Sequence, residues 1–348
     1  MSHLGGANFP MKAFVVTGPN RSEVQELDPP MAEPLQVIVD VERVGVCGTD
    51  VEFFTGEMAY LHQGVAEFPM RLGHEWCGTV SALGEGVDVS WLGRRVTGDT
   101  MLGCGRCSRC RSQRQHVCED RFEIGIRGGF PGALAQQLVV PATSLHALPD
   151  SVDSVAGALV EPGGNALRAV WGADVHVGDR VLVLGPGTIG LLVAQIARAE
   201  GAEVHLMGRT NESLDFARSL GFEHSWKVGD LPRLPWDSVI DCSNSAALPA
   251  LALELVEPGK RVVYIGLAGT PSTIDARTIA LKDVTAVGVL SASPGFAGTI
   301  ELFASGMVDP RPLVAATVGL DEVGAVLAGW RPTAALNGPK IHVDPRLI

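Results

Sequence analysis

The segment VLVLGPGTIG, residues 181–190, restricts the possible folds of this chain more than any other stretch. A Val/Leu run enters a glycine-rich turn, and the apolar helical pattern LLVAQIARAEG follows the turn directly. This order predicts a buried strand, a tight loop and a helix that packs back against the strand. Units of this kind build parallel sheets that are covered by helices on both faces.

The rest of the second half repeats this alternation. EVHLMG precedes ESLDFARSLG, SVIDCS precedes ALPALALELVEPGK, and RVVYIG and VTAVGVL complete the series. We therefore expect an α/β fold with a doubly wound parallel sheet. The preceding segment VAGALVEPGGNALRAVWGA is expected to be helical, with Pro162 and the two glycines after it interrupting the helix. Residues before about 155 show short period-2 runs such as LQVIVDVERVGVC and predict a mostly β domain rich in turns.

The glycine-rich turn has the spacing of a dinucleotide-binding loop, G-x-G-x-x-G. Gly185 permits the tight turn, Gly187 lets backbone N–H groups approach a pyrophosphate, and Gly190 lets helix and strand pack closely. Thr188 and Ile189 lie in the same loop at the start of the predicted helix. The alternative interpretation is a glycine turn of a doubly wound sheet that binds no ligand.

The end of the next strand predicts which dinucleotide binds. An NAD site has an acidic residue about 20 residues further on, which binds the ribose 2′-hydroxyl. Here the strand ends in EVHLMGRTNES, so Gly208 takes the place of the acid and Arg209 follows. Gly208 leaves room for a 2′-phosphate, Arg209 can bind it through charge-assisted hydrogen bonds, and Thr210 can donate as well. We expect NADP(H) in preference to NAD(H); the alternative is that Arg209 is a solvated loop cation.

Composition excludes several classes of function. The chain has 348 residues, 46% of them hydrophobic, and a formal net charge of −12 at pH 7. Nucleic acids and anionic membrane surfaces both need a basic surface, so neither is expected as a partner. The most apolar long stretch, residues 181–197, is interrupted by glycines and a proline, and a membrane span does not explain it. We see no signal peptide and expect a reducing, cytoplasmic compartment, where clustered cysteines suggest metal more than disulfides.

Four of the seven cysteines lie in the stretch CGRCSRCRSQRQHVC, with the spacing C-x2-C-x2-C-x7-C. Cys104, Cys107, Cys110 and Cys118 can fill a tetrahedral zinc and leave no open coordination position, which predicts a structural zinc site. A pair of disulfides is the alternative. Four arginines in the same stretch are expected to offset the net −2 charge of the centre; these are Arg106, Arg109, Arg111 and Arg114.

Three other segments carry the ligand types of a catalytic zinc. They are GVCGTD with Cys47, LGHEWCG with His74 and Glu75, and GALVEPGG with Glu161. Thiolate, imidazole and carboxylate are all zinc ligands, and a catalytic zinc uses three protein ligands and keeps one position for water or substrate. A lone His or Cys is usually structural, so no two of these segments establish a site by themselves.

Taken together, these landmarks resemble the medium-chain, zinc-dependent alcohol dehydrogenase family. GVCGTD, GHE, the four-cysteine lobe, GALVEP and GPGTIG appear in the family order over nearly the whole chain. The resemblance implies a β-rich, GroES-like catalytic domain at residues 1–158, a Rossmann domain at 159–294, and a return to the catalytic domain at 295–348. It also implies an enzyme of the polyol and sugar branch, where a glutamate like Glu161 binds zinc directly or through water.

The resemblance assigns roles to the residues of the first domain. Cys47 and His74 would hold the catalytic zinc, with Glu75 as a third ligand that is direct or exchanges with water. Thr49 would take the proton of the substrate hydroxyl, and Asp50 would orient the histidine ligand. Hydride would pass between an alcohol, polyol or sugar hydroxyl, or the corresponding carbonyl, and NADP(H).

One position departs from the family pattern. Many members have a histidine five residues after the zinc cysteine that ends the proton relay, whereas this chain has Glu52. A carboxylate can also shuttle a proton, and the sequence CGTD-x-E resembles the glucose dehydrogenase branch. The alternative is a surface glutamate on a helix.

Two other functions stay open from the sequence alone. One is a zinc-independent quinone or enoyl reductase of the same fold, which the presence of Cys47, His74 and Glu161 disfavours. The other is a protein that binds nucleotide and zinc without turnover, which the intact Thr49 disfavours. The family also suggests a homodimer or homotetramer, and a small-molecule alcohol, polyol, sugar or carbonyl as the only other partner.

Overall fold

A computed structural model describes residues 10–347 of the chain. The chain divides by its internal contacts into two units: unit 1 comprises residues up to 161 together with 314–336 and 340–348, and unit 2 comprises residues 162–313 and 337–339. Within the described residues, no helix has the length and apolar character needed to cross a lipid bilayer.

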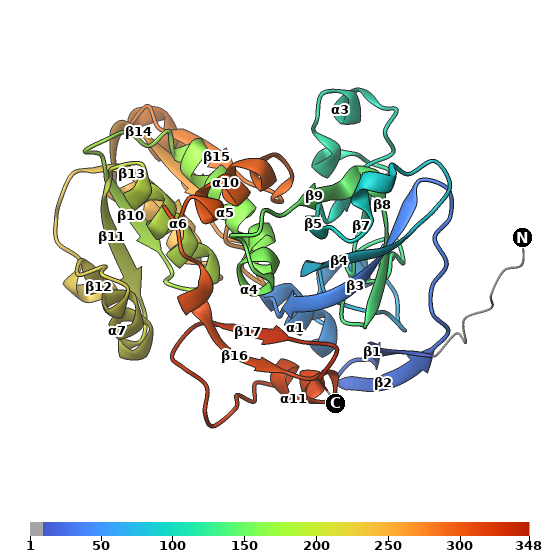
Figure 1. Ribbon diagram of the computed structural model, residues 1–348. Helices are drawn as coiled ribbons and strands as arrows, with labels where there is room; N and C mark the ends of the chain where they lie inside the picture. Colours follow the sequence, from blue (N-terminus) through green and yellow to red (C-terminus); the bar gives the residue numbers. More distant parts are fainter. Residues whose placement is uncertain (1–9, 348) are drawn as a thin grey trace, which may run out of the picture. The chain divides into compact units, whose positions relative to one another are not determined.

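Unit 1 is built on a mostly antiparallel sheet with the strand order β16-β17-β3-β4-β5-β9, to which β8 adds by pairing with β3 (Figure 1). The strands of this sheet are β3 (Gln36–Gly45), β4 (Glu75–Leu83), β5 (Arg95–Gly98), β8 (Gln137–Pro141), β9 (Leu145–Ala147), β16 (Val314–Val318) and β17 (Lys340–Val343). Two short sheets accompany it: β1 (Met11–Gly18) with β2 (Arg21–Leu27), and β6 (Met101–Leu102) with β7 (Phe122–Glu123). The late strands β16 and β17 therefore complete a sheet that begins near residue 36.

The central strand β3 shows why this part of the sequence forms a sheet. Val37, Val39 and Val41 alternate with more exposed residues and enter the hydrophobic core of unit 1. Its short helices are α1 (Gly48–Thr55), α2 (Ala59–His62), α3 (Ser108–Arg111), α4 (Ser154–Ala158) and α11 (Val323–Leu327).

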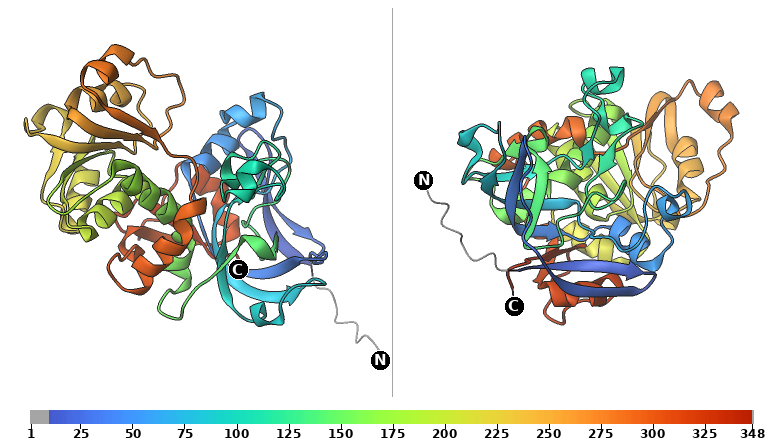
Figure 2. Two further views of the ribbon diagram at one scale, coloured as in Figure 1. Left: turned by 90° about the horizontal axis from the view of Figure 1, so that it is seen from above. Right: turned by 90° about the vertical axis from the view of Figure 1, so that its right-hand side faces the viewer.

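Unit 2 is a six-stranded parallel sheet with the order β12-β11-β10-β13-β14-β15. Its strands are β10 (Arg180–Leu184), β11 (Glu203–Gly208), β12 (Ser225–Lys227), β13 (Trp236–Asp241), β14 (Val256–Tyr264) and β15 (Thr285–Gly288). Its helices are α5 (Val160–Ala173, in unit 2 from residue 162 on), α6 (Thr188–Ala199), α7 (Asn211–Ser219), α8 (Leu248–Leu255), α9 (Ala276–Leu281) and α10 (Phe296–Ala304). Helices lie on both faces of the sheet (Figure 2). This confirms the predicted doubly wound fold, in which the order of successive strands reverses between β10 and β13 while all strands stay parallel.

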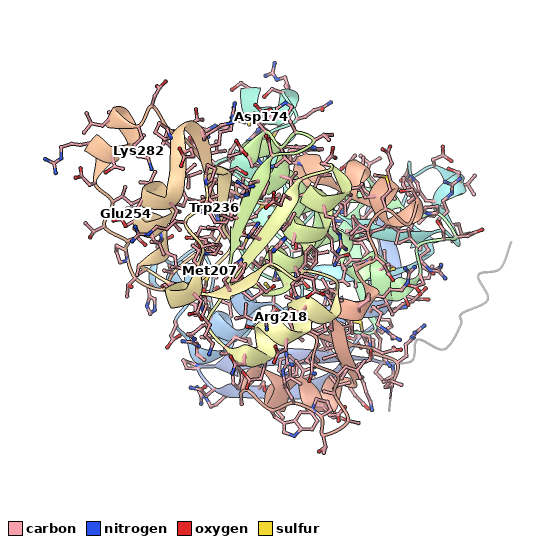
Figure 3. All side chains as sticks on the ribbon, turned by 90° about the vertical axis from the view of Figure 1, so that its left-hand side faces the viewer. Asp174, Met207, Arg218, Trp236, Glu254 and Lys282 are labelled. Carbon is pink, nitrogen blue, oxygen red and sulfur yellow. The ribbon has the colours of Figure 1, made fainter. Side chains whose placement is uncertain are left out.

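Buried apolar side chains fill the space between this sheet and α8. Met207 of β11 and Trp236 of β13, both labelled in Figure 3, belong to this core.

Lys282 donates to the carbonyl oxygens of Leu253 and Glu254 at 2.9 and 3.0 Å. It thereby satisfies acceptors that the last turn of α8 leaves without partners.

The helix before β10 differs from the prediction. The expected interruption at Pro162 and the following glycines does not occur, because α5 runs without a break over Val160–Ala173. Pro162 lies in the first turn, where its missing N–H would have no intrahelical acceptor. The break falls earlier, at Leu159, between α4 and α5.

The boundary after the parallel sheet also differs from the prediction. The sequence placed it at residue 295, whereas residues 295–313, including α10, group with unit 2. Glycines on α5 and α10 explain the grouping, because a Cβ at Gly163 would approach Thr299 to 2.5 Å and a Cβ at Gly298 would approach Leu167 to 2.8 Å. The two helices therefore pack closely at these two glycines. The hydrophobic pattern of the sequence does not predict this contact.

Candidate active site

Unit 1 brings together three of the residues that the sequence singled out as metal ligands. One ligand atom each of Cys47, His74 and Glu75 lies within 4.8 Å of the other two. Cys47 is the residue before α1, and Glu75 is the first residue of β4, directly after His74 (Figure 1). A thiol, an imidazole and a carboxylate that converge in this way fit a zinc ion.

Asp50 holds this group together. Its carboxylate is fully buried and accepts hydrogen bonds from the backbone N–H of Cys47 at 2.9 Å and from that of Gly73 at 3.3 Å. Its Oδ1 atom also faces His74 Nδ1 at 3.6 Å. One side chain thus fixes the backbone beside two candidate ligands and faces the ring of one of them.

The surroundings of His74 orient its ring for metal binding. The residue is buried, and its Nδ1 atom faces Asp50, which leaves Nε2 as the nitrogen for a metal. Burial by itself lowers the pKa of His74, but the Asp50 carboxylate and the Cys47 thiol raise that pKa well above its usual value. The same negative surroundings that hold a proton on this imidazole would favour a divalent cation.

Glu75 forms an ion pair that no sequence motif predicts. Lys340, on β17, donates to both carboxylate oxygens of Glu75, at 2.8 and 2.6 Å, and also to the carbonyl oxygen of Val46 at 3.0 Å. The two side chains are 4% and 2% exposed, so this is a buried ion pair. Burial lowers the pKa of Lys340, but Glu75 and Cys47 raise it more, and the net shift is upwards. Lys340 thus stays charged beside the candidate metal site.

The remaining catalytic residues from the sequence lie outside the three-ligand group. Glu161 is 8% exposed in the first turn of α5, and its carboxylate is not part of the group within 4.8 Å. Thr49 and Glu52 lie on α1 and are half-buried. Burial, followed by the charge of Glu57, raises the pKa of Glu52. The structure therefore brings three predicted ligands together. The roles of Glu161, Thr49 and Glu52 in the chemistry stay predictions.

The four clustered cysteines form a second metal-binding group in unit 1. All four sulfur atoms lie within 4.8 Å of one another, with 4.0 Å between Cys104 and Cys110 and 3.8 Å between Cys107 and Cys118. Disulfide sulfurs are about 2.05 Å apart, so these distances do not fit the disulfide alternative. Four ligands at about 2.3 Å around a tetrahedral zinc have sulfur–sulfur distances of about 3.8 Å. The group fits a zinc ion with no open position.

Side chains fasten this lobe to the strands beside it. Gln115 donates to Asp99 at 2.8 Å, and Arg121 donates to the carbonyl oxygen of Cys118 at 3.0 Å and to the buried carboxylate of Glu123 at 2.7 Å. The four arginines of the lobe are exposed, and Arg109 forms an ion pair with Glu119.

Loss of one thiolate from this lobe should destabilise the protein more than it lowers turnover per folded molecule. We expect Cys104→Ala to lower the free energy of unfolding by roughly 3 kcal/mol or more, because metal binding contributes to folding. Thermal unfolding with and without a chelator measures this. Cys77→Ala is the control, since Cys77 is a buried thiol that belongs to neither metal group. Full stability of Cys104→Ala together with lost turnover would contradict a structural role.

The glycine-rich loop of unit 2 has the geometry that its spacing predicts. Gly185 follows β10 with a positive φ of 94°. A Cβ at Gly190 would lie 1.9 Å from the carbonyl oxygen of Gly185, so only glycine fits there, and Gly187 stands directly before α6 with open space around it. A Cβ at Gly185 would meet Ser243, the second residue after β13, at 3.2 Å, which places the loop at the switch point between β10 and β13, where the strand order reverses. Open backbone and the start of α6 fit a pyrophosphate.

The end of β11 carries no carboxylate. A Cβ at Gly208 would approach Pro186 to 2.8 Å, so packing against the loop is one reason for glycine here. Arg209 is exposed and makes no hydrogen bond or ion pair to any residue from 10 to 347. The hydroxyl of Thr210 accepts from the backbone N–H of Ser213 at 3.3 Å and caps α7.

A third cluster of metal-type side chains has a different explanation. In unit 2, Trp226 donates its indole N–H to His205 Nδ1 at 3.1 Å, so the neutral ring carries its proton on Nε2 and donates it to Glu203 at 2.8 Å. Burial lowers the pKa of His205 and keeps the ring neutral. Both ring nitrogens are used, and His224 stacks on this ring with centroids 4.4 Å apart. Hydrogen bonding and stacking account for the cluster without a metal.

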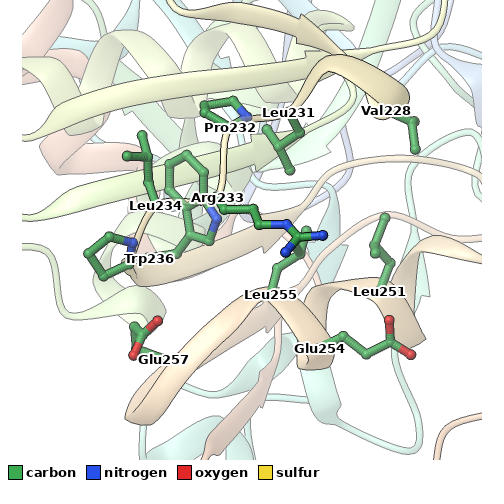
Figure 4. A pocket seen from close by; sticks show the side chains of 11 residues that line it. Val228, Leu231, Pro232, Arg233, Leu234, Trp236, Leu251, Glu254, Leu255 and Glu257 are labelled. Atoms are coloured by element: carbon green, nitrogen blue, oxygen red, sulfur yellow. The ribbon is translucent and has the colours of Figure 1, made fainter.

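Unit 2 has a recess of about 540 Å³, whose lining side chains Figure 4 shows. It is lined by Leu231, Leu234 and other apolar side chains, with Arg233, Glu254 and Glu257 among them. Trp236 in its wall is the first residue of β13, whereas ligands of parallel sheets bind at the carboxyl ends of the strands. The recess is therefore not part of the cofactor site.

Comparison with known proteins identifies the family of the chain. The family described as "Alcohol dehydrogenase GroES-like domain" matches residues 33–150, and the family described as "Zinc-binding dehydrogenase" matches residues 188–305. The chain is 32% identical over 305 residues to a 2-dehydro-3-deoxy-L-galactonate 5-dehydrogenase of Pseudoalteromonas atlantica, covering 84% of this chain and 87% of that one. It is also 32% identical to a sorbitol dehydrogenase of Halalkalibacterium halodurans, with 82% and 85% covered.

Solved structures extend the likeness to three dimensions. A protein of Sinorhizobium meliloti described as a zinc-binding dehydrogenase, bound to NADP, has a TM-score of 0.86 and 29% identity, with 97% of this chain and 99% of that one covered. An alcohol dehydrogenase of Thermus has the same TM-score and 28% identity, with 96% and 99% covered. From the profiles, the relatives and the fold, the chain belongs to the zinc-dependent medium-chain alcohol and polyol dehydrogenase family.

Proposed function

We propose that this dehydrogenase oxidises a secondary or primary hydroxyl of a polyol- or sugar-like substrate, or reduces the corresponding carbonyl, with NADP(H). The observation that supports this most is the convergence of Cys47, His74 and Glu75 beside the buried Asp50. The sorbitol and sugar-acid dehydrogenases among the relatives support a substrate with several hydroxyls.

The residues of unit 1 have different roles in the proposed reaction. Cys47 and His74 would hold a zinc ion, which would supply Lewis-acid polarisation of the substrate oxygen, and a bound nicotinamide would supply or accept the hydride. Asp50 keeps the two ligands in place through its hydrogen bonds to the backbone of Cys47 and Gly73. The hydroxyl of Thr49 takes the proton of the substrate hydroxyl and passes it towards solvent.

The three glutamates have separate parts in this proposal. Glu75, held by Lys340, would be a third ligand that exchanges with water, and the ion pair compensates its charge in the absence of a metal. Glu161 would bind the metal directly or through water. Glu52 on α1 relays the proton in place of the family histidine, and Glu52→Gln is expected to shift the pH–rate profile.

Arg209 is the residue that we propose for selecting NADP. Its side chain is exposed and unpaired within residues 10–347, directly after the glycine at the end of β11. Arg209→Gln should lower kcat/KM for NADP by about 10- to 100-fold and change kcat/KM for NAD little, since a charge-assisted contact to the 2′-phosphate is lost. Steady-state kinetics with both cofactors measures this, with Arg233→Gln, an exposed arginine in the loop before β13, as the control. A clear wild-type preference for NAD would contradict the assignment.

A substrate screen tests the proposal as a whole. The zinc-loaded protein is assayed with alcohols, polyols, aldoses and sugar acids, each with NADP. Turnover of at least one polyhydroxy substrate that chelation abolishes would support the proposed function. Turnover of quinones or enoyl compounds without zinc would favour the zinc-independent alternative, and cofactor binding without any turnover would favour a binding protein.

The setting of the enzyme is part of the proposal. Seven free cysteines, five of them in the two metal-binding groups, suit a reducing compartment, and we propose the cytoplasm. We also propose a homodimer or homotetramer, which sedimentation or light scattering of the zinc-loaded protein would test.

A further inference from the structure

Arg71 is a cation without a counter-ion in unit 1. Its side chain makes no hydrogen bond or ion pair to any residue from 10 to 347, and its Nε atom is sealed from solvent without a partner. Other arginines of the unit reach carboxylates; these pairs are Arg43–Asp344, Arg95–Glu42, Arg109–Glu119, Arg121–Glu123 and Arg346–Asp344. Arg106 and Arg114 also lack a carboxylate partner among the described residues, but they are exposed, whereas Arg71 is half-buried with a fully buried Nε atom.

The surroundings of Arg71 make an unpaired charge unfavourable. Burial lowers the pKa of Arg71 from its usual 12.5 to about 10, and no neighbouring acid opposes the shift. The group still carries its charge at neutral pH. A buried charge destabilises a fold unless an opposite charge or hydrogen bonds compensate it, so the position is explained if a ligand brings the anion. Only Nε is fully buried and unpaired, so the terminal nitrogens, which bind no described residue, can reach such a ligand.

Arg71 is attached rigidly to the candidate active site. Met70 exchanges two backbone hydrogen bonds of 2.9 Å with Val16, and Gly132 donates to the carbonyl oxygen of Arg71 at 2.8 Å. Gly73 donates to Asp50, and the next residue is His74. Three residues span at most about 11 Å, so the Cα atoms of Arg71 and His74 lie within that distance. A short polyol chain and an arginine side chain together can bridge such a gap.

Arg71 stands between two residues that contact the hydrophobic core of unit 1. Leu72 belongs to this core, and Met70 packs against it, whereas Arg71 is in neither set. Arg71 is half-buried, so part of its side chain remains open to solvent or to a ligand.

We propose that Arg71 binds an anionic group of the substrate, so that the substrate is a sugar acid or a sugar phosphate rather than a neutral polyol. The inference rests on the proposed function for the reacting hydroxyl, whereas the anion site itself rests on Arg71 alone. A guanidinium presents two parallel N–H donors that match a carboxylate or a phosphate. The anionic end would be held at Arg71 while a hydroxyl further along the chain reaches the ligands Cys47 and His74.

The experiment compares one neutral and two anionic substrates in three variants of the zinc-loaded enzyme. Sorbitol, gluconate and sorbitol 6-phosphate are assayed with NADP, and they separate a carboxylate from a phosphate. Arg71→Met should lower the ratio of kcat/KM for the preferred anion to that for sorbitol by about 10- to 100-fold. Arg71→Lys should retain part of the preference. Arg277→Met removes an equal charge from an exposed position of unit 2 and should leave the ratio unchanged.

A second measurement does not depend on turnover. Inorganic phosphate and gluconate are added separately, and the melting temperature is recorded, because a ligand that binds only the folded state stabilises it. The preferred anion should raise the melting temperature of the wild type and of Arg277→Met but not of Arg71→Met. Arg71→Met without ligand should be at least as stable as the wild type, because the substitution removes an uncompensated charge.

The outcomes separate this inference from the proposed function. Turnover of sorbitol with an unchanged preference in Arg71→Met would overturn the role of Arg71 and leave the dehydrogenase assignment standing. Stabilisation by an anion that depends on Arg71, without turnover of any of the three substrates, would support the anion site and count against the proposed reaction. Equal stabilisation of wild type and Arg71→Met by both anions would overturn the anion site.

Discussion

Cys47→Ser should reduce kcat/KM by at least about 1,000-fold while the melting temperature stays close to that of the wild type. A Lewis acid contributes several kcal/mol to such a reaction, and each 1.4 kcal/mol is a factor of about ten in rate. Serine is a poor zinc ligand at neutral pH. It is also a good residue before a helix, and the backbone N–H of Cys47 keeps its bond to Asp50, so α1 should remain folded.

The matched variant is Cys104→Ser, which removes a thiolate from the other metal group. It should lose stability and keep most of its turnover per folded molecule, the reverse of Cys47→Ser. Initial rates and thermal unfolding of both proteins give the comparison. If the two variants behaved alike in both measurements, the division into one catalytic and one structural site would be wrong.

The second large effect concerns the buried ion pair beside the metal ligands. Lys340→Met should lower the free energy of unfolding by about 3–5 kcal/mol, because it leaves the Glu75 carboxylate buried without its partner. For a protein of 348 residues we expect the melting temperature to fall by roughly 4–7 °C. The metal-free protein should show the effect most clearly, since a bound cation would compensate part of the charge of Glu75.

A double variant tests whether the effect comes from the pair. Lys340→Met with Glu75→Gln removes both charges and should recover much of the stability that Lys340→Met loses. The pair also predicts a pH dependence: the pKa of Lys340 lies above its usual 10.5, so its contribution is complete below that pH and is lost as pH rises through the folded-state pKa. A single variant as stable as the wild type would show that the ion pair contributes nothing to folding.

Local sequence patterns predicted much of this protein because the features they specify depend on residues that are close together in the sequence. The glycines at 185, 187 and 190 meet steric requirements within one turn, and the four cysteines need only a short loop to converge. The alternation of strands and helices gave the parallel sheet. For Cys47, His74 and Glu75, the motifs and the family resemblance named the ligands, and the structure brings their ligand atoms together.

The rest depends on contacts between distant parts of the chain. Lys340 is 265 residues away from Glu75, and a lysine in the strand-like KIHV gives no sign that it is buried. Pro162 and the glycines after it looked like a helix break, although the first turn tolerates them. The grouping of α10 with unit 2 depends on Gly163 of α5 and Gly298 of α10, which have no side chain to keep the two helices apart. The sequence does not single out Arg71, because it shows a charged residue but not whether that residue has a partner in the fold.

Zinc content is the most direct test of two metal sites with separate roles. Elemental analysis of the purified proteins should find two zinc ions per chain in the wild type and one in Cys47→Ser, which should still unfold like the wild type. Cys104→Ser should retain the zinc that supports turnover. A wild type with a single zinc that is lost on replacement of Cys104, with turnover intact, would contradict a catalytic metal at Cys47 and His74.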